Sequence, residues 1–258
     1  MNRLSISKLS RAIAAACATL ALTSHGFCQA PPGPGLPGPS MMHEVSPGVY
    51  EMGKLHLEQA THTLSFPGTV NMEKGNIEYL LVTPAGNAHE SLLVTSDVEP
   101  RDLHLAMLLL GAKGAGIHGT PADEAPPGQI SREYLTHAPK LRGDDLGITV
   151  TWKDAKGVEK TSPVEDWILK TDVHKQAERG PWIYNGSMFS TEGRFLAQVE
   201  GNFAALVTNP AALINNPRKG SDNDQIWEVN TKTAPPPQTP VKITIQLLHP
   251  DAEPAPKK

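Results

Sequence analysis

Hydrophobic and polar residues alternate along several short stretches of the chain, and this period of two predicts β-strands. The clearest stretch lies near the C-terminus, where Val241, Ile243, Ile245 and Leu247 alternate with polar residues. The stretch 54–58 (KLHLE) repeats the pattern much earlier in the chain. Strands of this kind bury one face and expose the other, so we expect sheet structure around a single core.

Two pairs of β-rich runs flank four-residue turn sequences and predict two hairpins. The paired runs are 76–83 with 88–95, and 146–153 with 158–161. The turn sequences between them are PAGN at 84–87 and DAKG at 154–157. Further strands are expected over 182–187, 194–200 and 203–208. The chain also holds 22 glycines and 24 prolines, which favours turn-rich β structure. We therefore predict a mainly β fold (α+β), an antiparallel barrel or sandwich.

Residues 100–110 (PRDLHLAMLLL) carry a helical pattern instead. Asp97 is a possible helix cap, Pro100 suits the first turn, and Gly111 suits the C-terminal end. Small and apolar side chains form one stripe, and other leucines extend the apolar character around the helix. The stripe is Leu103, Ala106, Met107 and Leu110, and the other leucines are Leu105, Leu108 and Leu109. A helix that is apolar on nearly all sides is expected to be buried on several of them. We therefore predict one buried helix.

The first thirty residues have the pattern of a secretory signal peptide. Arg3, Lys8 and Arg11 precede an apolar run, and no acidic residue occurs before Glu44. The run is too short to anchor the chain in a bilayer. Cys17 has lipobox-like neighbours, but it lies inside the apolar run, which argues against a lipoprotein anchor. We expect export to the periplasm or the extracellular space.

Composition then divides the rest of the chain. Residues 31–46 are expected to be a Pro/Gly-rich linker, residues 47–250 a single β-rich domain, and residues 251–258 a disordered tail. Within the domain, 113–140 is rich in glycine and proline and is expected to be a long loop.

Cysteine and charge counts exclude several functions. Cys17 and Cys28 are the two cysteines of the chain, and both belong to the export segment. A mature domain without cysteine has no thiolate zinc site, Cys-ligated iron–sulfur cluster or thiol nucleophile. Loss of the export segment removes three basic and no acidic residues, which changes the formal charge from −4 to −7. Such a domain is a poor match for nucleic acid or an anionic membrane. We also expect no transmembrane segment in the mature chain.

Four residues are candidates for chemistry: His89, Glu90, His104 and His118. Histidine and carboxylate side chains bind divalent metals or act as an acid–base pair. However, neighbours in a strand, such as His89 and Glu90, point to opposite faces of the sheet. A helix folded back along its strand places His104 level with Leu93 rather than with His89. The alternative for His104 is a hydrogen-bonded structural role.

Five stretches of the sequence, taken together, resemble those of YdjY-domain proteins. The stretches are 75–82 (GNIEYLLV), 86–93 (GNAHESLL), 103–111 (LHLAMLLLG), 182–187 (WIYNGS) and 240–245 (PVKITI). The likeness covers about residues 49–248. It implies a single exported domain, and it assigns no activity, cofactor or catalytic residue to this chain.

Two functions remain open at this point. The first is a non-enzymatic extracytoplasmic binding or interaction module, whose ligand or protein partner the sequence does not identify. The second is a metal-dependent enzyme or hydrolase that uses His89 and Glu90, with His104 or His118 as a further ligand.

Overall fold

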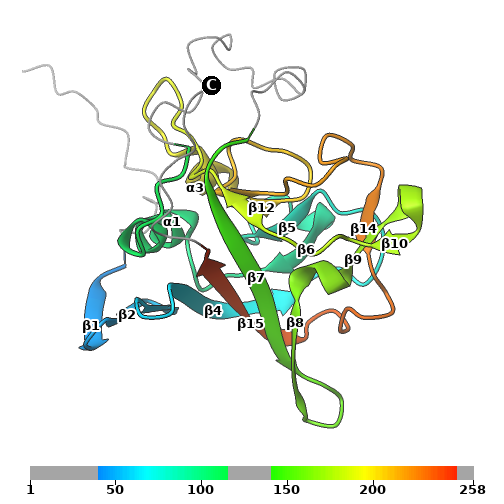
Figure 1. Ribbon diagram of the computed structural model, residues 1–258, viewed down its shortest axis with the longest axis horizontal. Helices are drawn as coiled ribbons and strands as arrows, with labels where there is room; N and C mark the ends of the chain where they lie inside the picture. Colours follow the sequence, from blue (N-terminus) through cyan, green and yellow to red (C-terminus); the bar gives the residue numbers. More distant parts are fainter. Residues whose placement is uncertain (1–39, 116–140, 249–258) are drawn as a thin grey trace, which may run out of the picture. The chain divides into compact units, whose positions relative to one another are not determined.

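The computed structural model describes residues 40–115 and 141–248 (Figure 1). Within these residues, eight strands close into a barrel in the order β4–β15–β7–β11–β13–β12–β5–β6, and β6 pairs back to β4. The barrel strands are β4 (Thr63–Val70), β5 (Tyr79–Val82), β6 (Ser91–Val94), β7 (Asp144–Lys153), β11 (Trp182–Tyr184), β12 (Asn202–Ala205), β13 (Ile214–Asn215) and β15 (Pro240–Leu247). The mainly β fold is therefore confirmed, and its form is the barrel.

Further strands extend or flank the barrel. β1 (Met42–Ser46), β2 (Val49–Met52) and β3 (Leu55–Glu58) continue the sheet beyond β4, and β8 (Glu159–Pro163) pairs with β7. A separate three-stranded sheet consists of β9 (Ile168–Lys170), β10 (Lys175–Gln176) and β14 (Trp227–Val229). β1 lies inside the range 31–46 and pairs with β2, so strand structure begins within the predicted linker.

The period of two correctly located β15 and β3, whereas β4, which is as long as β15, was not predicted. In β15, the side chains of Val241, Ile243, Ile245 and Leu247 are buried, as their alternation predicts. β15 pairs along its length with β4 on one side and with β7 on the other. The predicted hairpin of β7 and β8 is also confirmed, because these strands pair antiparallel around the 154–157 turn.

The other predicted hairpin is wrong, because β5 and β6 pair in parallel. The turn sequence at 84–87 does not reverse the chain. Instead, the backbone around Gly86 packs against the turn before β12, where an added Cβ would lie 2.9 Å from the carbonyl oxygen of Gly201. The connection continues through the 3-10 helix η1 (Ala88–Glu90) and returns the chain beside β5. β12 and β13 are parallel as well, so the barrel is mixed rather than purely antiparallel.

The helix expected over 100–110 is present as α1 (Pro100–Leu109), with Pro100 in its first turn. Glu99 rather than Asp97 occupies the N-cap position. Gly111 follows the helix with φ +93°, and the amide of Ala112 donates to the carbonyl of Met107 at 3.1 Å. This is the Schellman arrangement that glycine favours, because it requires a left-handed residue.

The burial predicted for α1 is only half right. The stripe of Leu103, Ala106, Met107 and Leu110 is buried in the core, with each side chain at most 4% exposed. The remaining leucines are exposed: Leu105 at 41%, Leu108 at 45% and Leu109 at 43%. The barrel therefore covers one side of α1 and leaves a second apolar side in solvent.

A short helix, α3 (Leu196–Glu200), occupies the range 194–200, where a strand was expected. The hydroxyl of Ser187 accepts the amide proton of Ala197 at 3.1 Å, and Gly201 ends the helix in the left-handed conformation with φ +69°. Two more 3-10 helices, η3 (Val164–Trp167) and η4 (Thr171–Val173), lie next to β9. Among the described residues, no helix combines the length and apolarity that crossing a bilayer requires.

A buried ion pair fixes the start of β11. The carboxylate of Glu165 accepts hydrogen bonds from the guanidinium of Arg218 at 2.6 Å and from the indole of Trp182 at 3.1 Å. The Arg218 guanidinium also lies 5.0 Å from the centre of the Trp182 ring. Both charges are compensated, which makes their burial tolerable. Tyr184 lies two residues after Trp182 in the same strand, and its side chain extends toward α1.

The two sides of α1 should respond differently to truncation. Leu103→Ala is expected to lower the free energy of unfolding by about 2–5 kcal/mol, because it opens a cavity in the core. Leu105→Ala is expected to cost about 1 kcal/mol or less, because its side chain is largely in water. Urea denaturation of the two variants measures the difference. Equal losses would contradict this placement of α1.

Candidate functional site

A hydrogen bond between α1 and β11 forms the centre of the candidate site. The Nδ1 atom of His104 lies 2.7 Å from the hydroxyl oxygen of Tyr184. Tyr184 is fully buried, and His104 is half-buried at the edge of the core. The chain turns just after Tyr184 at Gly186, which has φ +81° and lies against the His104 ring. The bond thus ties the middle of the helix to the end of a barrel strand.

Burial keeps both partners of this bond uncharged near neutral pH. It lowers the pKa of His104 below the ordinary histidine value. Burial, followed by the negative charge of Asp144, raises the pKa of Tyr184 well above the ordinary tyrosine value. Asp144 lies directly opposite Tyr184 in the antiparallel pairing of β11 with β7. A neutral His–Tyr pair can form a stable hydrogen bond. A tyrosine with a raised pKa keeps its proton near neutral pH and is therefore a poor general base.

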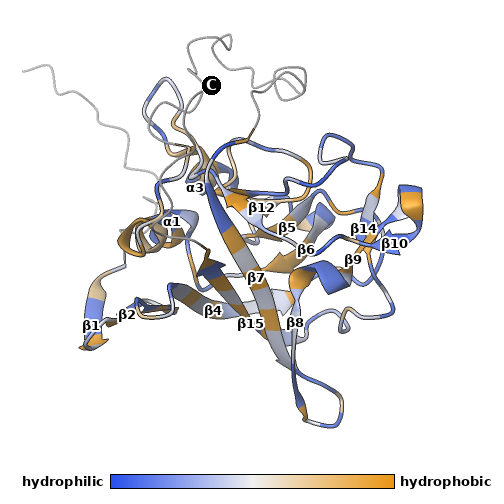
Figure 2. Ribbon diagram, viewed as in Figure 1, coloured by the Kyte–Doolittle hydropathy of each residue, from blue (hydrophilic) through white to orange (hydrophobic). Residues whose placement is uncertain are grey.

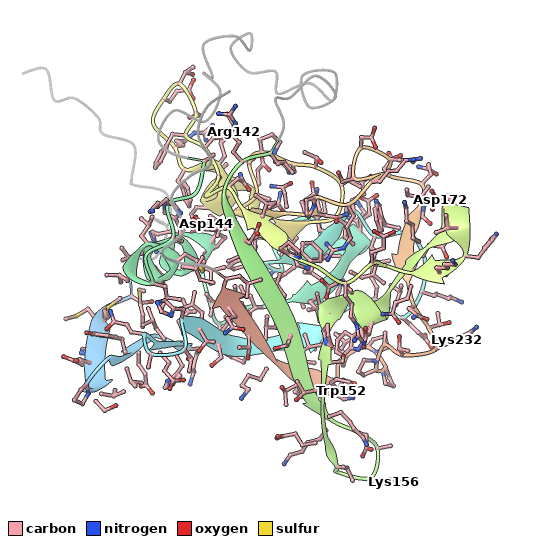
Figure 3. All side chains as sticks on the ribbon, viewed as in Figure 1. Arg142, Asp144, Trp152, Lys156, Asp172 and Lys232 are labelled. Atoms are coloured by element: carbon pink, nitrogen blue, oxygen red, sulfur yellow. The ribbon has the colours of Figure 1, made fainter. Side chains whose placement is uncertain are left out.

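Asp144 organises the chain that follows α1. Its Oδ2 atom accepts the backbone amide protons of Lys113 at 2.7 Å and Gly114 at 2.6 Å. The next amide, that of Ala115, donates to the carbonyl of Asn185 at 3.0 Å. Gly114 approaches that carbonyl so closely that an added Cβ would lie 2.9 Å from its oxygen. These contacts fix the chain at the end of the first described segment, beside the start of β7 (Figure 3).

Aromatic side chains continue the site from α1 to α3. The ring centres of His104 and Phe195 are 4.9 Å apart, and those of Phe195 and Phe189 are 5.2 Å apart. The two helices are also joined by polar contacts, because the side chain of Gln198 donates to Glu99 at 2.6 Å and accepts from the amide of Arg101 at 3.1 Å. α1 and α3 therefore lie next to each other (Figure 1).

The outer part of this surface is apolar. Leu105, Leu108 and Leu109 have the i, i+3, i+4 spacing that places them side by side on a helix. Leu108 lies one helical turn after His104, whose ring contacts Phe195. The leucines are therefore next to the residue that contacts the two phenylalanines. Phe189, at the outer end of that pair, is 58% exposed. We call the set Leu105, Leu108, Leu109, Phe189 and Phe195 the apolar face. The hydrophobic colouring of α1 in Figure 2 belongs partly to this face and partly to the buried stripe.

Charged residues of both signs lie on α1 and on the segments next to it. The basic residues are Lys113, Arg142 and Arg194, which are exposed, and Arg101, which is partly exposed and pairs with the buried carboxylate of Asp102 at 3.4 Å. Arg142 lies two residues before Asp144, at the start of β7 (Figure 3). The acidic residues include Asp97 and Glu192, which are exposed, and Glu99, which is partly exposed at the N-cap of α1.

Of the residues singled out from the sequence, the structure brings His89 and Glu90 together and gives His104 different neighbours. His89 and Glu90 lie in η1 rather than in a strand, so their side chains meet, with His89 Nε2 3.7 Å from Glu90 Oε2. His89 is 75% exposed and Glu90 37% exposed. His104 has a different set of neighbours, Tyr184 and Phe195. Its hydrogen bond agrees with the structural role considered from the sequence. In the described part of the chain, no three His, Cys, Asp or Glu side chains group together as metal ligands would.

His118, and most of the loop expected over 113–140, lie outside the described residues. Tyr184, Asp144 and the two phenylalanines were not identified from the sequence. Tyr184 belongs to a predicted strand, but nothing local in its neighbourhood indicates that it meets His104, eighty residues earlier. The exposed leucines were visible in the sequence and were assigned to the core.

Together these features define a class of protein: a mixed-sheet β-barrel domain with one helix packed against its core and an apolar surface beside a buried His–Tyr pair. The sequence model of the YdjY domain matches residues 55–246, which is most of the chain. The chain therefore belongs to the YdjY domain family, as the resemblance of its motifs implied. No curated protein and no solved structure matches it.

The burial of His104 should make stability depend on pH, because it lowers the pKa of that side chain in the folded protein. The unfolded chain takes up a proton on His104 near the ordinary histidine pKa of about 6.5, whereas the folded chain does so only at lower pH. The free energy of unfolding should therefore fall as the pH is lowered through about 6.5 toward the folded pKa of His104. Urea denaturation at pH 7.5 and pH 5.5 tests this expectation.

The matched variants are His104→Asn and His89→Asn. The first replaces the ring with a side chain that does not titrate, so its loss of stability between the two pH values should be smaller than that of the unmodified protein. The second changes an exposed side chain and should leave the pH dependence intact. The same pH dependence in His104→Asn and the unmodified protein would contradict the assignment.

Proposed function

We propose that this protein is an exported, non-enzymatic binding module that uses the apolar face as its contact surface. The observation that carries the proposal is the exposure of Leu105, Leu108 and Leu109 on one side of α1, together with the exposed Phe189 on the chain that leads to α3. A hydrophobic helix surface in water is unfavourable for the isolated domain, so its retention is explained most simply by a contact that covers it.

The size of the face supports this function. Leu105, Leu108 and Leu109 are each more than 40% exposed on α1, and Phe189 is 58% exposed on the chain that leads to α3. The largest apolar patches that typical monomeric proteins expose are often functional. Four large apolar side chains exposed to this degree support a contact surface on these elements.

The architecture also suits a binding role. The leucines project from a helix whose other side is anchored in the core, so the face is held rigidly. The His104–Tyr184 bond fixes the rotation of that helix, and the contact of Phe195 with His104 orders the aromatic end. A preformed surface loses little conformational entropy when it is covered. Export is supported by the signal-peptide pattern of residues 1–30.

An environment-sensitive dye such as bis-ANS tests the contact surface. The double variant Leu105→Ser/Leu108→Ser should bind several-fold less dye than the unmodified protein, because it removes much of the exposed apolar area. Val158→Ser, in the β7–β8 turn, is the control, since Val158 is 49% exposed but lies outside the face. Thermal unfolding verifies that each variant is folded. Undiminished dye binding by the folded double variant would overturn the proposal.

A further inference from the structure

We propose that His43, Glu51 and His56 form a binding site for a late first-row divalent metal ion, Zn²⁺. The three residues lie on the sheet that β1, β2 and β3 build beyond β4 of the barrel (Figure 1). The inference involves none of the residues of the apolar face and does not depend on the proposed function. It is carried by the register of three neighbouring strands.

The strand register places the three side chains in one row. His43 lies directly opposite Glu51 in the antiparallel pairing of β1 with β2. Glu51 in turn lies directly opposite His56 in the antiparallel pairing of β2 with β3. Residues that oppose each other across neighbouring strands project from the same face of the sheet. The middle strand therefore supplies a carboxylate, and each strand beside it supplies an imidazole.

This row faces solvent. Leu55 and Leu57, the neighbours of His56 in β3, are buried in the core. Because side chains alternate between the two faces of a strand, His56 points away from the core, and so does Glu51 opposite it. The side chain of His56 is 47% exposed, that of Glu51 is 56% exposed, and His43 is exposed as well. An ion can therefore reach all three side chains from solvent.

The spacing of the strands suits one shared ion. Directly opposed residues of antiparallel strands have Cα atoms about 4.5 or 5.5 Å apart, so His43 and His56 are separated by about 10 Å across Glu51. Two imidazole side chains that start this far apart on one face can converge above the residue between them. Their nitrogens can then meet one ion at the usual Zn–N distance of about 2.0–2.1 Å.

Two of the three side chains already lie close together. The Nδ1 atom of His56 is 3.9 Å from the Oε1 atom of Glu51, which is longer than a hydrogen bond. In the described part of the chain, no three His, Cys, Asp or Glu side chains are grouped as they stand, so His43 has to rotate toward this pair. Exposed side chains change rotamer on the picosecond-to-nanosecond timescale, so this rotation is not a barrier to binding.

The chemistry of the ligand set favours Zn²⁺. Imidazole nitrogens suit late first-row metals such as zinc, whereas Ca²⁺ and Mg²⁺ are bound by oxygen ligands. Two imidazoles and one carboxylate leave the fourth tetrahedral position of Zn²⁺ to water. The three ligands come together through the pairing of three strands, so the ion should bind the folded chain more tightly than the unfolded chain. Binding should therefore stabilise the fold.

Calorimetric titration with Zn²⁺ tests the site. We expect His43→Asn and His56→Asn each to bind Zn²⁺ about tenfold or more weakly than the unmodified site, because each variant removes one nitrogen ligand. Glu51→Gln should also weaken binding, because it removes the negative charge of the row. The matched control is His174→Asn, which should leave the affinity unchanged. It removes an exposed histidine at φ +50°, a conformation that asparagine tolerates.

All samples carry Cys17→Ser and Cys28→Ser, so that no thiolate competes for the ion. Circular dichroism verifies that each variant is folded. Thermal unfolding provides a second readout, since Zn²⁺ should raise the melting temperature of the control but not that of His43→Asn or His56→Asn. Equal Zn²⁺ affinity in His43→Asn, His56→Asn and His174→Asn would overturn the proposal. Absence of Zn²⁺ binding, or a preference for Ca²⁺ or Mg²⁺ over Zn²⁺, would overturn it as well.

Discussion

The rest of the structure depends on how α1 is held against the barrel. Burial of a leucine-sized side chain contributes about 1.5–3 kcal/mol, and Leu103, Met107 and Leu110 of α1 are all buried in the core. A hydrogen bond contributes about 1 kcal/mol, which is less, but it is directional. The bond from His104 to Tyr184 therefore selects one rotation of the helix about its axis. That rotation exposes the remaining leucines.

The same constraint joins parts of the chain that lie far apart in sequence. Tyr184 reaches α1 from β11, and Asp144, its partner in register, fixes the backbone that follows the helix. Phe195 also contacts the His104 ring. Each of these contacts orders an element at the edge of the apolar face. The face is consequently a preformed feature of the fold, and the hydrogen bond beneath it joins α1 to β11.

Local sequence patterns predicted local structure well, but they failed where contacts between distant parts of the chain determine the conformation. The alternation in β15 and the Pro100 and Gly111 signals of α1 were sufficient, because each depends on neighbouring residues. The turn sequence before His89 gave a wrong prediction of a hairpin. Gly86 instead allows the backbone to pack closely against Gly201. For α1, a sequence that is apolar on all sides does not reveal which side meets the core. The partnership of His104 with a tyrosine was likewise hidden.

The central claim is that the leucines at 105, 108 and 109 face solvent while the stripe beside them is buried. NMR of leucine methyl groups in the presence of a soluble paramagnetic agent measures this exposure directly. The account predicts strong broadening of the methyl signals of Leu105, Leu108 and Leu109, and little broadening for Leu103 and Leu110. Protection of all five, or broadening of Leu103 and Leu110, would contradict it.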